Sequence, residues 1–245
     1  MTKRLELCLH SAILGSALIV ALSLTACKSK PAASEGSASA PATRTSTQSV
    51  SNGKQLSTGA HKLMEAVNNP TKSFHFSFSG QENISEKYLR DKTQAPEVGP
   101  VGLEADISPD EMNLTETRGQ TKKTTDAKKS DQMSWAMAHL TVLGPMTSAN
   151  FSIALGSSVA SSPSSDMVGT SAADKYTFDT ATATGPQKMG LDAVRSMLTN
   201  VKDTKGTAWI AKDSGELIKF NIDTDYQDKN GHSWKEHYEG EVTPK

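Results

Sequence analysis

The chain has very little cysteine. Its 245 residues include two, Cys8 and Cys27, and both lie in the first 27 positions. The rest of the sequence therefore contains no disulfide framework, no cysteine metal site and no catalytic thiolate. A fold built from these residues has to rest on its hydrophobic core.

The sequence also lacks a long apolar run and an excess of either charge. Its 26 Lys and Arg against 27 Asp and Glu leave a formal net charge of −1, and mean hydropathy is −0.46. Nucleic-acid partners select for a strongly basic chain, so we expect none. Aromatic residues make up 5% of the chain and hydrophobic residues 36%.

What the sequence does have is an export signal. Lys3 and Arg4 precede an apolar segment, residues 12–24. The small residues Thr25 and Ala26 follow it. A basic start, a short apolar stretch and a small-residue cleavage site are typical of a secretory signal peptide. These 13 residues fall short of the roughly 20 that a membrane-spanning helix needs.

The tetrapeptide Leu24-Thr25-Ala26-Cys27 resembles the lipobox of bacterial lipoproteins at every position. The resemblance implies that a signal peptide, residues 1–26, is cleaved between Ala26 and Cys27. It also implies a diacylglyceryl group on the Cys27 sulfur and a further acyl chain, such as palmitate, on the new amino terminus. Lys28, rather than Asp, follows the cysteine, which in a two-membrane cell favours the outer membrane. An ordinary signal peptide with a chance cysteine is the alternative.

The segment after the cysteine is poor in large apolar residues. Residues 27–52 are mostly Ser, Ala, Thr and Pro, with Val50 as the one large apolar side chain after Cys27. Such a composition cannot offset the entropy lost on ordering, so we expect a disordered tether. We predict one folded domain over residues 53–245.

Three segments of that domain have apolar residues at helical spacing. We predict helices over residues 56–67, 131–143 and 191–201, with Ser130 or Asp131 capping the second and Gly144-Pro145 ending it. Phe151–Leu155 fits a helix or a strand, and residues 157–171 read as a loop. The basic segment 118–129 is predicted as a solvated hairpin tip, with an anion-binding patch as the alternative.

Other segments alternate between apolar and polar residues, as a strand does when one face is buried. The last three are separated by turn residues, Asp213-Ser-Gly215 and Asp228-Lys-Asn-Gly231, which indicates a meander. The predicted strands cover residues 74–79, 101–107, 111–118, 175–178, 206–212, 216–226 and 231–242. We therefore predict an α+β fold, a curved antiparallel sheet with helices packed on its concave face.

This element order is similar to that of the LolA/LolB and LppX/LprG-type lipoproteins. The similarity covers about residues 53–243 and is carried by the helix-to-strand passage Leu63–Ser79 and the passage Lys205–Val242. It implies an open half-barrel around an apolar cavity for acyl chains. The candidate cavity-lining residues are Phe74, Phe76, Phe78, Trp135, Leu140, Leu198, Ile218, Phe220 and Ile222. The same phenylalanines also fit an ordinary packed core.

No motif for catalysis or metal binding stands out. His232 and His237 are an odd number of residues apart on a predicted strand, so they face opposite sides. We therefore expect no enzyme, no metal and no cofactor.

Two functions remain. One is a monomeric envelope lipoprotein that faces the periplasm and binds or transfers acyl lipid or lipoprotein cargo. The other is a structural or protein-interaction lipoprotein without lipid cargo. A hydrolase would need a catalytic constellation that the sequence does not contain.

Overall fold

The computed structural model describes residues 42–197 and 200–245. It is a mixed α+β structure, as predicted. The helices are α2 (Ala42–Asn68), α3 (Glu86–Arg90), α4 (Gln132–Ser157), the 3-10 turn η1 (Thr180–Thr182) and α5 (Gly185–Met197). The strands are β1 (Phe74–Asn83), β2 (Val98–Ile107), β3 (Glu111–Arg118), β4 (Thr121–Lys128), β5 (Ser164–Val168), β6 (Ser171–Asp179), β7 (Val201–Ala211), β8 (Leu217–Gln227) and β9 (Ser233–Pro244).

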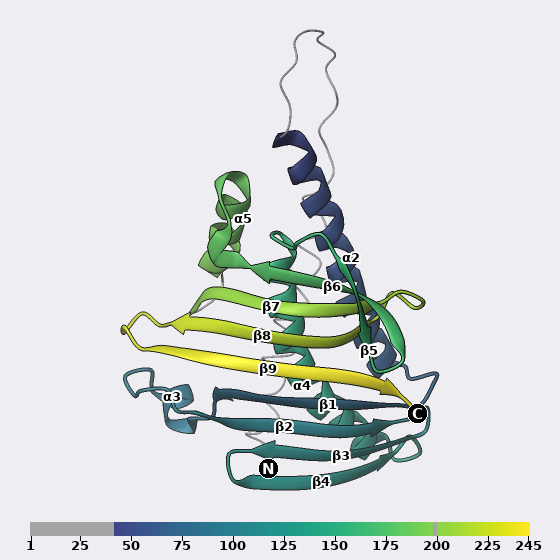
Figure 1. Ribbon diagram of the computed structural model, residues 1–245. Helices are drawn as coiled ribbons and strands as arrows, with labels where there is room; N and C mark the ends of the chain where they lie inside the picture. The colour runs from purple at the N-terminus through teal and green to yellow at the C-terminus, as the bar shows by residue number, and fades with distance from the viewer. Residues whose placement is uncertain (1–41, 198–199) are drawn as a thin grey trace.

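Within the described residues, the strands form one antiparallel, unclosed sheet of nine strands (Figure 1). Its order is β4-β3-β2-β1-β9-β8-β7-β6-β5. Two meanders, β1–β4 and β5–β9, are therefore joined where the first strand pairs with the last. Phe76 lies opposite Val242 at this junction. The sequence predicted the closing meander β7–β9 but not β4, β5 or this long-range pairing.

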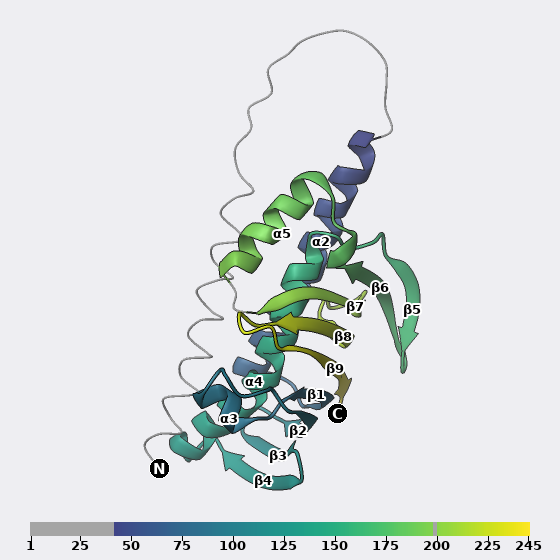
Figure 2. The ribbon, with the colours of Figure 1, turned by 90° about the vertical axis from the view of Figure 1, so that its left-hand side faces the viewer.

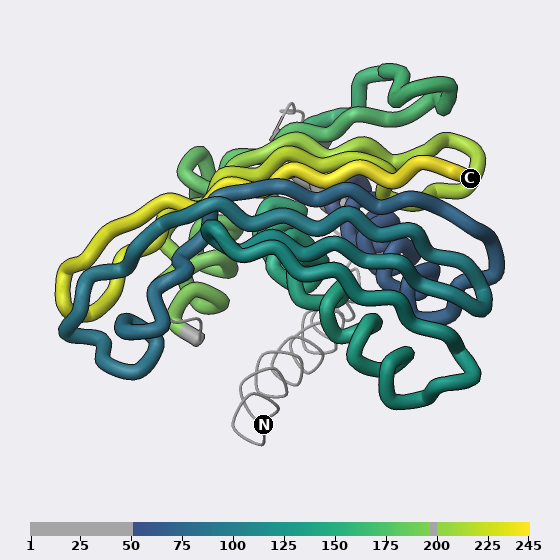
Figure 3. Tube along the Cα trace, turned by 90° about the horizontal axis from the view of Figure 1, so that it is seen from below, coloured from purple at the N-terminus to yellow at the C-terminus, as the bar shows by residue number. Residues whose placement is uncertain are grey.

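The helices α2 and α4 lie together on one face of the sheet (Figure 3). Alternate side chains of each strand are buried against them. In β1 these are Phe74, Phe76 and Phe78, between 0% and 8% exposed. In β9, Tyr238 and Val242 of the predicted face pack in the main core, whereas Trp234 of the same face is half-buried and stacks on Tyr226. Period-two alternation thus predicted the inner face of these strands correctly.

Helix α2 begins well before the predicted residue 56. Residues 42–52, which we expected in the disordered tether, are helical; residues 28–41 lie outside the described part of the chain. From Asn52 onward, contacts with other parts of the chain explain why the segment is helical. The Asn52 side chain donates to the Ser161 carbonyl at 2.9 Å, and Gly53 lies so close to Ser157 of α4 that a Cβ would collide with its carbonyl. A close helix contact of small residues leaves no apolar pattern in the sequence.

Helix α4 begins as predicted but does not end at Gly144-Pro145. The Asp131 carboxylate accepts hydrogen bonds from the backbone N–H groups of Met133 and Ser134, a standard N-cap. Proline inside a helix removes a backbone hydrogen bond and costs about 3 kcal/mol. The helix continues because the following turns bury Met146, Ala149 and Ile153. Burial of a side chain as large as Met or Ile stabilises the fold by about 1.5–3 kcal/mol, which offsets the cost of the proline. Phe151–Leu155 is therefore helical.

Two further segments form strands that the sequence did not predict. The basic segment 118–129 is not a long hairpin tip: only Gly119 and Gln120 form the turn, and β4 pairs with β3 along its whole length. The Ser-rich segment 157–171 contains β5, paired with β6. Both are edge strands. Most of their side chains are exposed, so the sequence shows no alternation of apolar and polar residues that would predict a strand. Pairing with a neighbouring strand defines them, supported by single side chains such as Ala127 of β4 in the main core and Asp166 of β5, which accepts from Trp209 Nε1.

Two predictions about the last third of the chain need correction. The predicted helix 191–201 spans Gly185–Met197 instead, because Asn200 has a left-handed φ of 86° and Val201 already belongs to β7. Ile218 does not share a face with Phe220 and Ile222. A register shift in β8 pairs Trp209 with Lys219 and Ile210 with Leu217, so Leu217 enters the core in its place.

Candidate functional site

Five of the predicted cavity-lining residues lie in the main core. Phe74, Phe76, Phe78, Phe220 and Ile222 are at most 8% exposed and belong to one cluster with α2 and α4. Phe78 stacks on Tyr238, with 5.6 Å between ring centroids. These side chains contact one another as the side chains of a packed core do.

The other predicted lining residues do not join that group. Trp135 is partly buried at the edge of the core and packs edge-on against His139. Leu140 and Ile218 are half-buried and belong to neither apolar cluster. Leu198 lies outside the described residues, as do Ala26 and Cys27.

A cleft of about 410 Å³ lies elsewhere, between α5, η1 and the beginning of β7. This volume falls in the range of small-molecule sites. The lining residues come from segments that are close in sequence. They are Thr180, Ala181, Ala183, Lys188, Arg195, Val201, Lys202 and Asp203.

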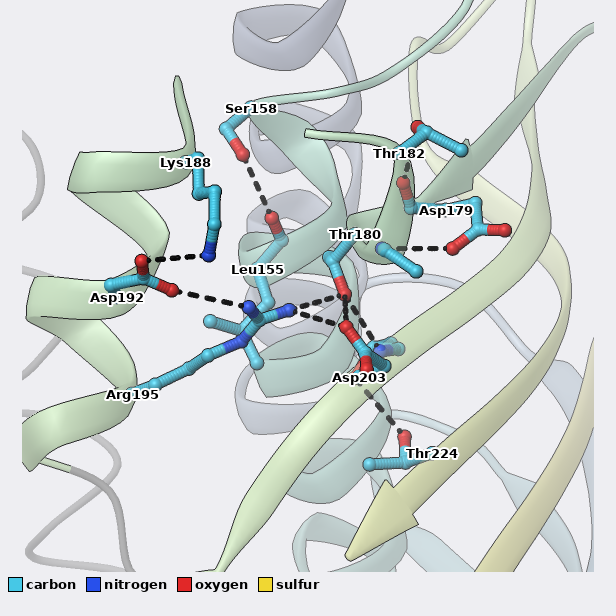
Figure 4. Close-up of polar contacts among 12 residues, drawn as sticks. Leu155, Ser158, Asp179, Thr180, Thr182, Lys188, Asp192, Arg195, Asp203 and Thr224 are labelled. Atoms are coloured by element: carbon cyan, nitrogen blue, oxygen red, sulfur yellow. Dashed lines mark hydrogen bonds and ion pairs between the residues drawn. The ribbon is translucent and has the colours of Figure 1, made fainter. Parts of the chain in front are cut away.

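The floor of the cleft is held by the Thr180 side chain (Figure 4). Asp179 caps the short η1 turn by accepting from the Ala181 N–H at 2.9 Å, and this turn buries Thr180 to 2% exposure. The Thr180 hydroxyl oxygen then accepts from the Thr204 N–H and from Arg195 Nη2, each at 2.8 Å. One hydroxyl therefore joins β7, η1 and α5.

Arg195 connects α5 to the sheet through charge. Its Nη2 donates to Asp203 Oδ1 at 2.8 Å and its Nη1 to Asp192 Oδ1 at 3.5 Å, while the side chain is 18% exposed (Figure 4). Lys188 Nζ donates to the other oxygen of Asp192 at 3.0 Å. This hydrogen bond is the main reason that the pKa of Asp192 lies below its ordinary value. Arg195 Nε is buried and has no hydrogen-bond partner in the described residues.

Behind the polar mouth lies a second apolar cluster, distinct from the main core. It is formed by Leu155 of α4, Ala183 at the end of η1 and Leu191 of α5, and the partly buried side chains of Phe151, Val159, Val194 and Val201 pack against it. Ala183 and Val201 also line the cleft. The cleft lining thus combines charged side chains with the apolar side chains of Ala183 and Val201.

Buried hydroxyl groups lie between the two apolar clusters. Ser152 of α4 and Thr224 of β8 are within 3.2 Å of each other through their side-chain oxygens, and Thr204 donates to Thr224 at 3.4 Å. All three residues are 1% exposed. These three hydroxyl groups satisfy one another where α4 crosses the sheet, whereas Asn150 Nδ2 of the same helix is buried without a hydrogen-bond partner in the described residues.

A separate polar group is buried near the β8–β9 hairpin. Glu236 accepts from the Asn83 N–H at 3.1 Å, from Trp234 Nε1 at 3.0 Å and from the Tyr238 hydroxyl at 2.6 Å. Burial raises the pKa of Tyr238, and the neighbouring carboxylate of Glu236 raises it further. Burial likewise raises the pKa of Glu82, although its ion pair with Arg118 opposes this. All these donors are engaged within the sheet, so we assign the group a structural role.

Sequence reasoning missed the cleft residues. Arg195 follows Leu191 by four positions, which places a cation beside the apolar stripe of a predicted helix, and Asp192 and Asp203 are the carboxylates within reach. The position of Arg195 beside this apolar stripe is the feature of the sequence that could have indicated a buried charge. Thr180 has no such feature, because it is one of several threonines in the segment before α5 and nothing in the sequence distinguishes it from the others.

Within residues 42–197 and 200–245, no group of three or more His, Cys, Asp or Glu is arranged to hold a metal ion. No helix in that described part combines the length and apolar character required to cross a membrane. The sequence matches no protein-family model and no curated protein.

Proposed function

We propose that the chain is a membrane-anchored, non-catalytic lipoprotein of the bacterial cell envelope that binds or transfers acyl lipid. In this proposal Cys27 carries the lipid anchor, and the domain faces the periplasm, on the outer membrane if the cell has two. The sheet acts as an open half-barrel with α2 and α4 on its concave side.

The observation that carries the proposal is the composition of the α5 cleft. A ligand that occupies it would meet the cations Lys188, Arg195 and Lys202 and also the apolar side chains of Ala183 and Val201, so the lining is part charged and part apolar. An amphiphile has this same division between a polar head and an apolar chain. The main core offers no such polar end to the side chains first expected to line a cavity.

The position of α5 adds support. None of its described side chains belongs to the main core, and it lies away from the body of the sheet (Figure 2). Elements with few buried apolar contacts open at low free-energy cost, and ligand-binding elements are drawn from them. An acyl chain that entered between α4 and α5 would replace contacts of the small cluster and leave the core intact.

Lipid content tests the proposal. The full-length protein should be purified under native conditions, and its bound lipids identified by extraction and mass spectrometry. We expect acyl lipid at a stoichiometry near one. Leu191→Glu, which places a carboxylate in the apolar cluster, should abolish it, whereas Met189→Glu at an exposed position of the same helix should not. Lipid-free protein that also takes up none from vesicles would refute the proposal.

The anchor has its own test. Replacing Cys27 with Ser should release the protein from the membrane fraction or leave the precursor uncleaved, because serine has no sulfur to accept the diacylglyceryl group. Cell fractionation and the mass of the chain measure both results. Unchanged membrane attachment of the Cys27→Ser protein would exclude lipidation at this residue.

A protein-interaction lipoprotein without lipid cargo is the second candidate, and one observation favours it. The first turns of α4 expose Met133 and Met137, which are 79% and 44% accessible, next to the end of edge strand β4. Exposed methionines are common at adaptable binding surfaces. Crosslinking in cells that captures one specific protein, combined with lipid-free purified protein, would favour this function.

A further inference from the structure

We propose that the open edge of strand β4, together with the first turns of α4, binds an extended acidic segment of a partner protein, which pairs with β4 as an additional strand. The inference goes beyond lipid binding, because it concerns the end of the domain opposite to the α5 cleft (Figure 1). It gives the protein-interaction candidate a partner of stated chemistry, and it holds with or without a lipid cargo.

The free backbone edge of β4 is the first argument. In the described sheet β4 is an outermost strand and pairs with β3 alone. Alternate residues of an antiparallel strand bond to the neighbouring strand, and the bond from the Lys129 N–H to the Asp110 carbonyl fixes which ones do. The backbone groups of Lys122, Thr124 and Asp126 therefore point away from β3, and within the described residues no hydrogen bond reaches them. Such a row of donors and acceptors fits an extended segment.

The charge along this edge selects the kind of segment. β4 and the turn that follows it contain four lysines and one carboxylate: Lys122, Lys123, Lys128, Lys129 and Asp126. Lys128 pairs with Glu111 of β3 at 3.6 Å. Glu116 lies opposite Lys123 in the ladder but forms no ion pair with it, and Lys122 has no ion pair with a described residue either. The first half of β4 therefore keeps two unpaired positive charges at the edge.

Lysines on an edge strand also prevent pairing between copies of a protein. Like charges that face one another across two strands oppose pairing, whereas opposite charges stabilise it. A second copy of this chain would bring its own lysines to the same edge. A segment with Glu or Asp opposite Lys122 and Lys123 would instead be attracted. The basic edge thus excludes most strands and accepts acidic ones.

Apolar side chains lie along the same edge. Met133 and Met137 of α4 are 79% and 44% exposed, and Ala136 is exposed between them. Residues three and four positions apart share a helix face, and this face is turned away from Ala138 and Val142, which enter the main core. The first turns of α4 lie beside β4 on the inner side of the sheet (Figure 2). Alternate side chains of an added strand would point to this side, so we expect its acidic residues to alternate with apolar ones.

The position of the edge favours a protein over the membrane. The described chain begins at Ala42, at one end of the domain, and β4 lies at the other end (Figures 1 and 2). In the proposed function the lipid anchor at Cys27 precedes Ala42, so it joins the domain at the end opposite to β4. We therefore assign the edge to a protein partner, and the membrane becomes an outcome of the test.

Two synthetic peptides test the proposal. The probe is a peptide of alternating valine and glutamate, blocked at both ends and as long as β4, 8 residues. The control peptide has lysine in place of glutamate. Fluorescence anisotropy gives the affinity for the full-length protein, and hydrogen exchange followed by NMR locates the site. We expect the acidic peptide to bind about tenfold more tightly than the basic one, and to slow exchange at the N–H groups of Lys122, Thr124 and Asp126.

Variants separate charge from backbone pairing. Lys122→Glu and Lys123→Glu should each weaken binding of the acidic peptide by about fivefold, whereas Lys229→Glu at an exposed turn far from β4 should not change it. Thr124→Pro removes an outward N–H at a position where an edge strand tolerates proline, and should weaken binding by about tenfold. Ser165→Pro makes the same change on the other edge strand, β5, and should leave binding unchanged. Circular dichroism verifies that each variant is folded.

Equal affinity for the two peptides would overturn the inference. Binding that Thr124→Pro leaves unchanged would also overturn it, because attraction of charges without strand pairing would then account for the affinity. A dimer that Thr124→Pro dissociates in analytical ultracentrifugation would assign the edge to a second copy. Protection of the same N–H groups by phosphatidylglycerol vesicles, without peptide binding, would assign it to the membrane. Lipid content enters none of these measurements, so their failure leaves the lipid-binding proposal untouched.

Discussion

The main core and the α5 region are built from the same kinds of residues but are held together differently. In the main core, α2 and α4 cover the inner face of the sheet, and buried apolar side chains from almost every strand contact one another. Helix α5 rests on three buried apolar residues and on the charged contacts of Arg195. The first arrangement stabilises the whole domain. The second holds one helix in place and leaves room for a ligand.

This contrast explains why the expected cavity residues and the observed cleft do not coincide. Aromatic residues on alternate strand positions, such as Phe76, maximise burial and fill the space between sheet and helices. A cleft persists where the chain has small residues and paired charges, as at Ala183 and Asp203. The proposed ligand site therefore lies in the polar α5 region rather than in the main core.

The largest effect is expected in the main core. Replacing Phe76 with Ala should lower the free energy of unfolding by about 3–5 kcal/mol, because its side chain is fully buried and leaves a cavity. Urea unfolding followed by circular dichroism measures the loss. Phe76→Leu is the control and should cost clearly less. A Phe76→Ala protein as stable as the wild type would contradict the assignment of this residue to the core.

A smaller and local effect is expected for α5. Leu191→Ala should cost about 2 kcal/mol, near the lower end for a buried leucine, because its cluster is small. Since α5 contributes no described side chain to the main core, hydrogen exchange should accelerate in α5 while β1, β9 and α4 remain protected. Equal acceleration across the sheet would show that α5 unfolds only with the whole domain, and the distinction between the two regions would fail.

The charged contact of α5 should contribute less again. Asp203→Asn removes the negative partner of a largely buried guanidinium, and we expect a loss of about 1–2 kcal/mol, again confined to α5 exchange. Asp213→Asn makes the same change at an exposed turn and serves as the control. An unchanged exchange rate in α5 of the Asp203→Asn protein would mean that apolar contacts alone hold the helix.

The smallest effect concerns the outer face of the sheet, where charges are exposed. Burial lowers the pKa of His237, but hydrogen bonds with Asp223 and Glu239 outweigh it and raise the pKa above 6.5. Protonation therefore favours the folded state. The stabilisation is fully present below pH 6.5 and disappears as pH rises through the higher folded-state value.

Replacing Asp223 with Asn should move the His237 pKa down, as measured by NMR titration. Asp225→Asn, whose carboxylate pairs with Lys235 on the same face, should leave it unchanged. A His237 pKa that does not respond to Asp223→Asn would assign the shift to Glu239 alone.

Several elements of this fold could be predicted because their signals are local. Alternation predicts Phe74, Phe76 and Phe78 on the inner face, and the sequence predicts Ser130 or Asp131 as a helix cap, the role that Asp131 has. Gly215 and Gly231 adopt the positive φ angles, 68° and 87°, that their hairpin turns require. Each of these features depends on a few neighbouring residues, so the amino-acid order suffices.

Other elements depend on partners far away in the chain. Pro145 lies inside α4 because Met146 and Ile153 are buried beyond it, and residues 157–171 contain a strand because β6 offers an edge. Ile218 leaves the core because a register shift gives its place to Leu217. No periodicity in the sequence reports such contacts.

The amino-acid sequence by itself determined the strand faces, the turns and the helix cap, and it predicts the lipid anchor at Cys27. Only the tertiary structure decided the pairing of β1 with β9 and the meeting of Thr180, Arg195 and Asp203 at one cleft. The physical reason is distance along the chain. Local conformational preferences act over a few residues, whereas a site forms when packing of separate elements brings polar groups within hydrogen-bond reach.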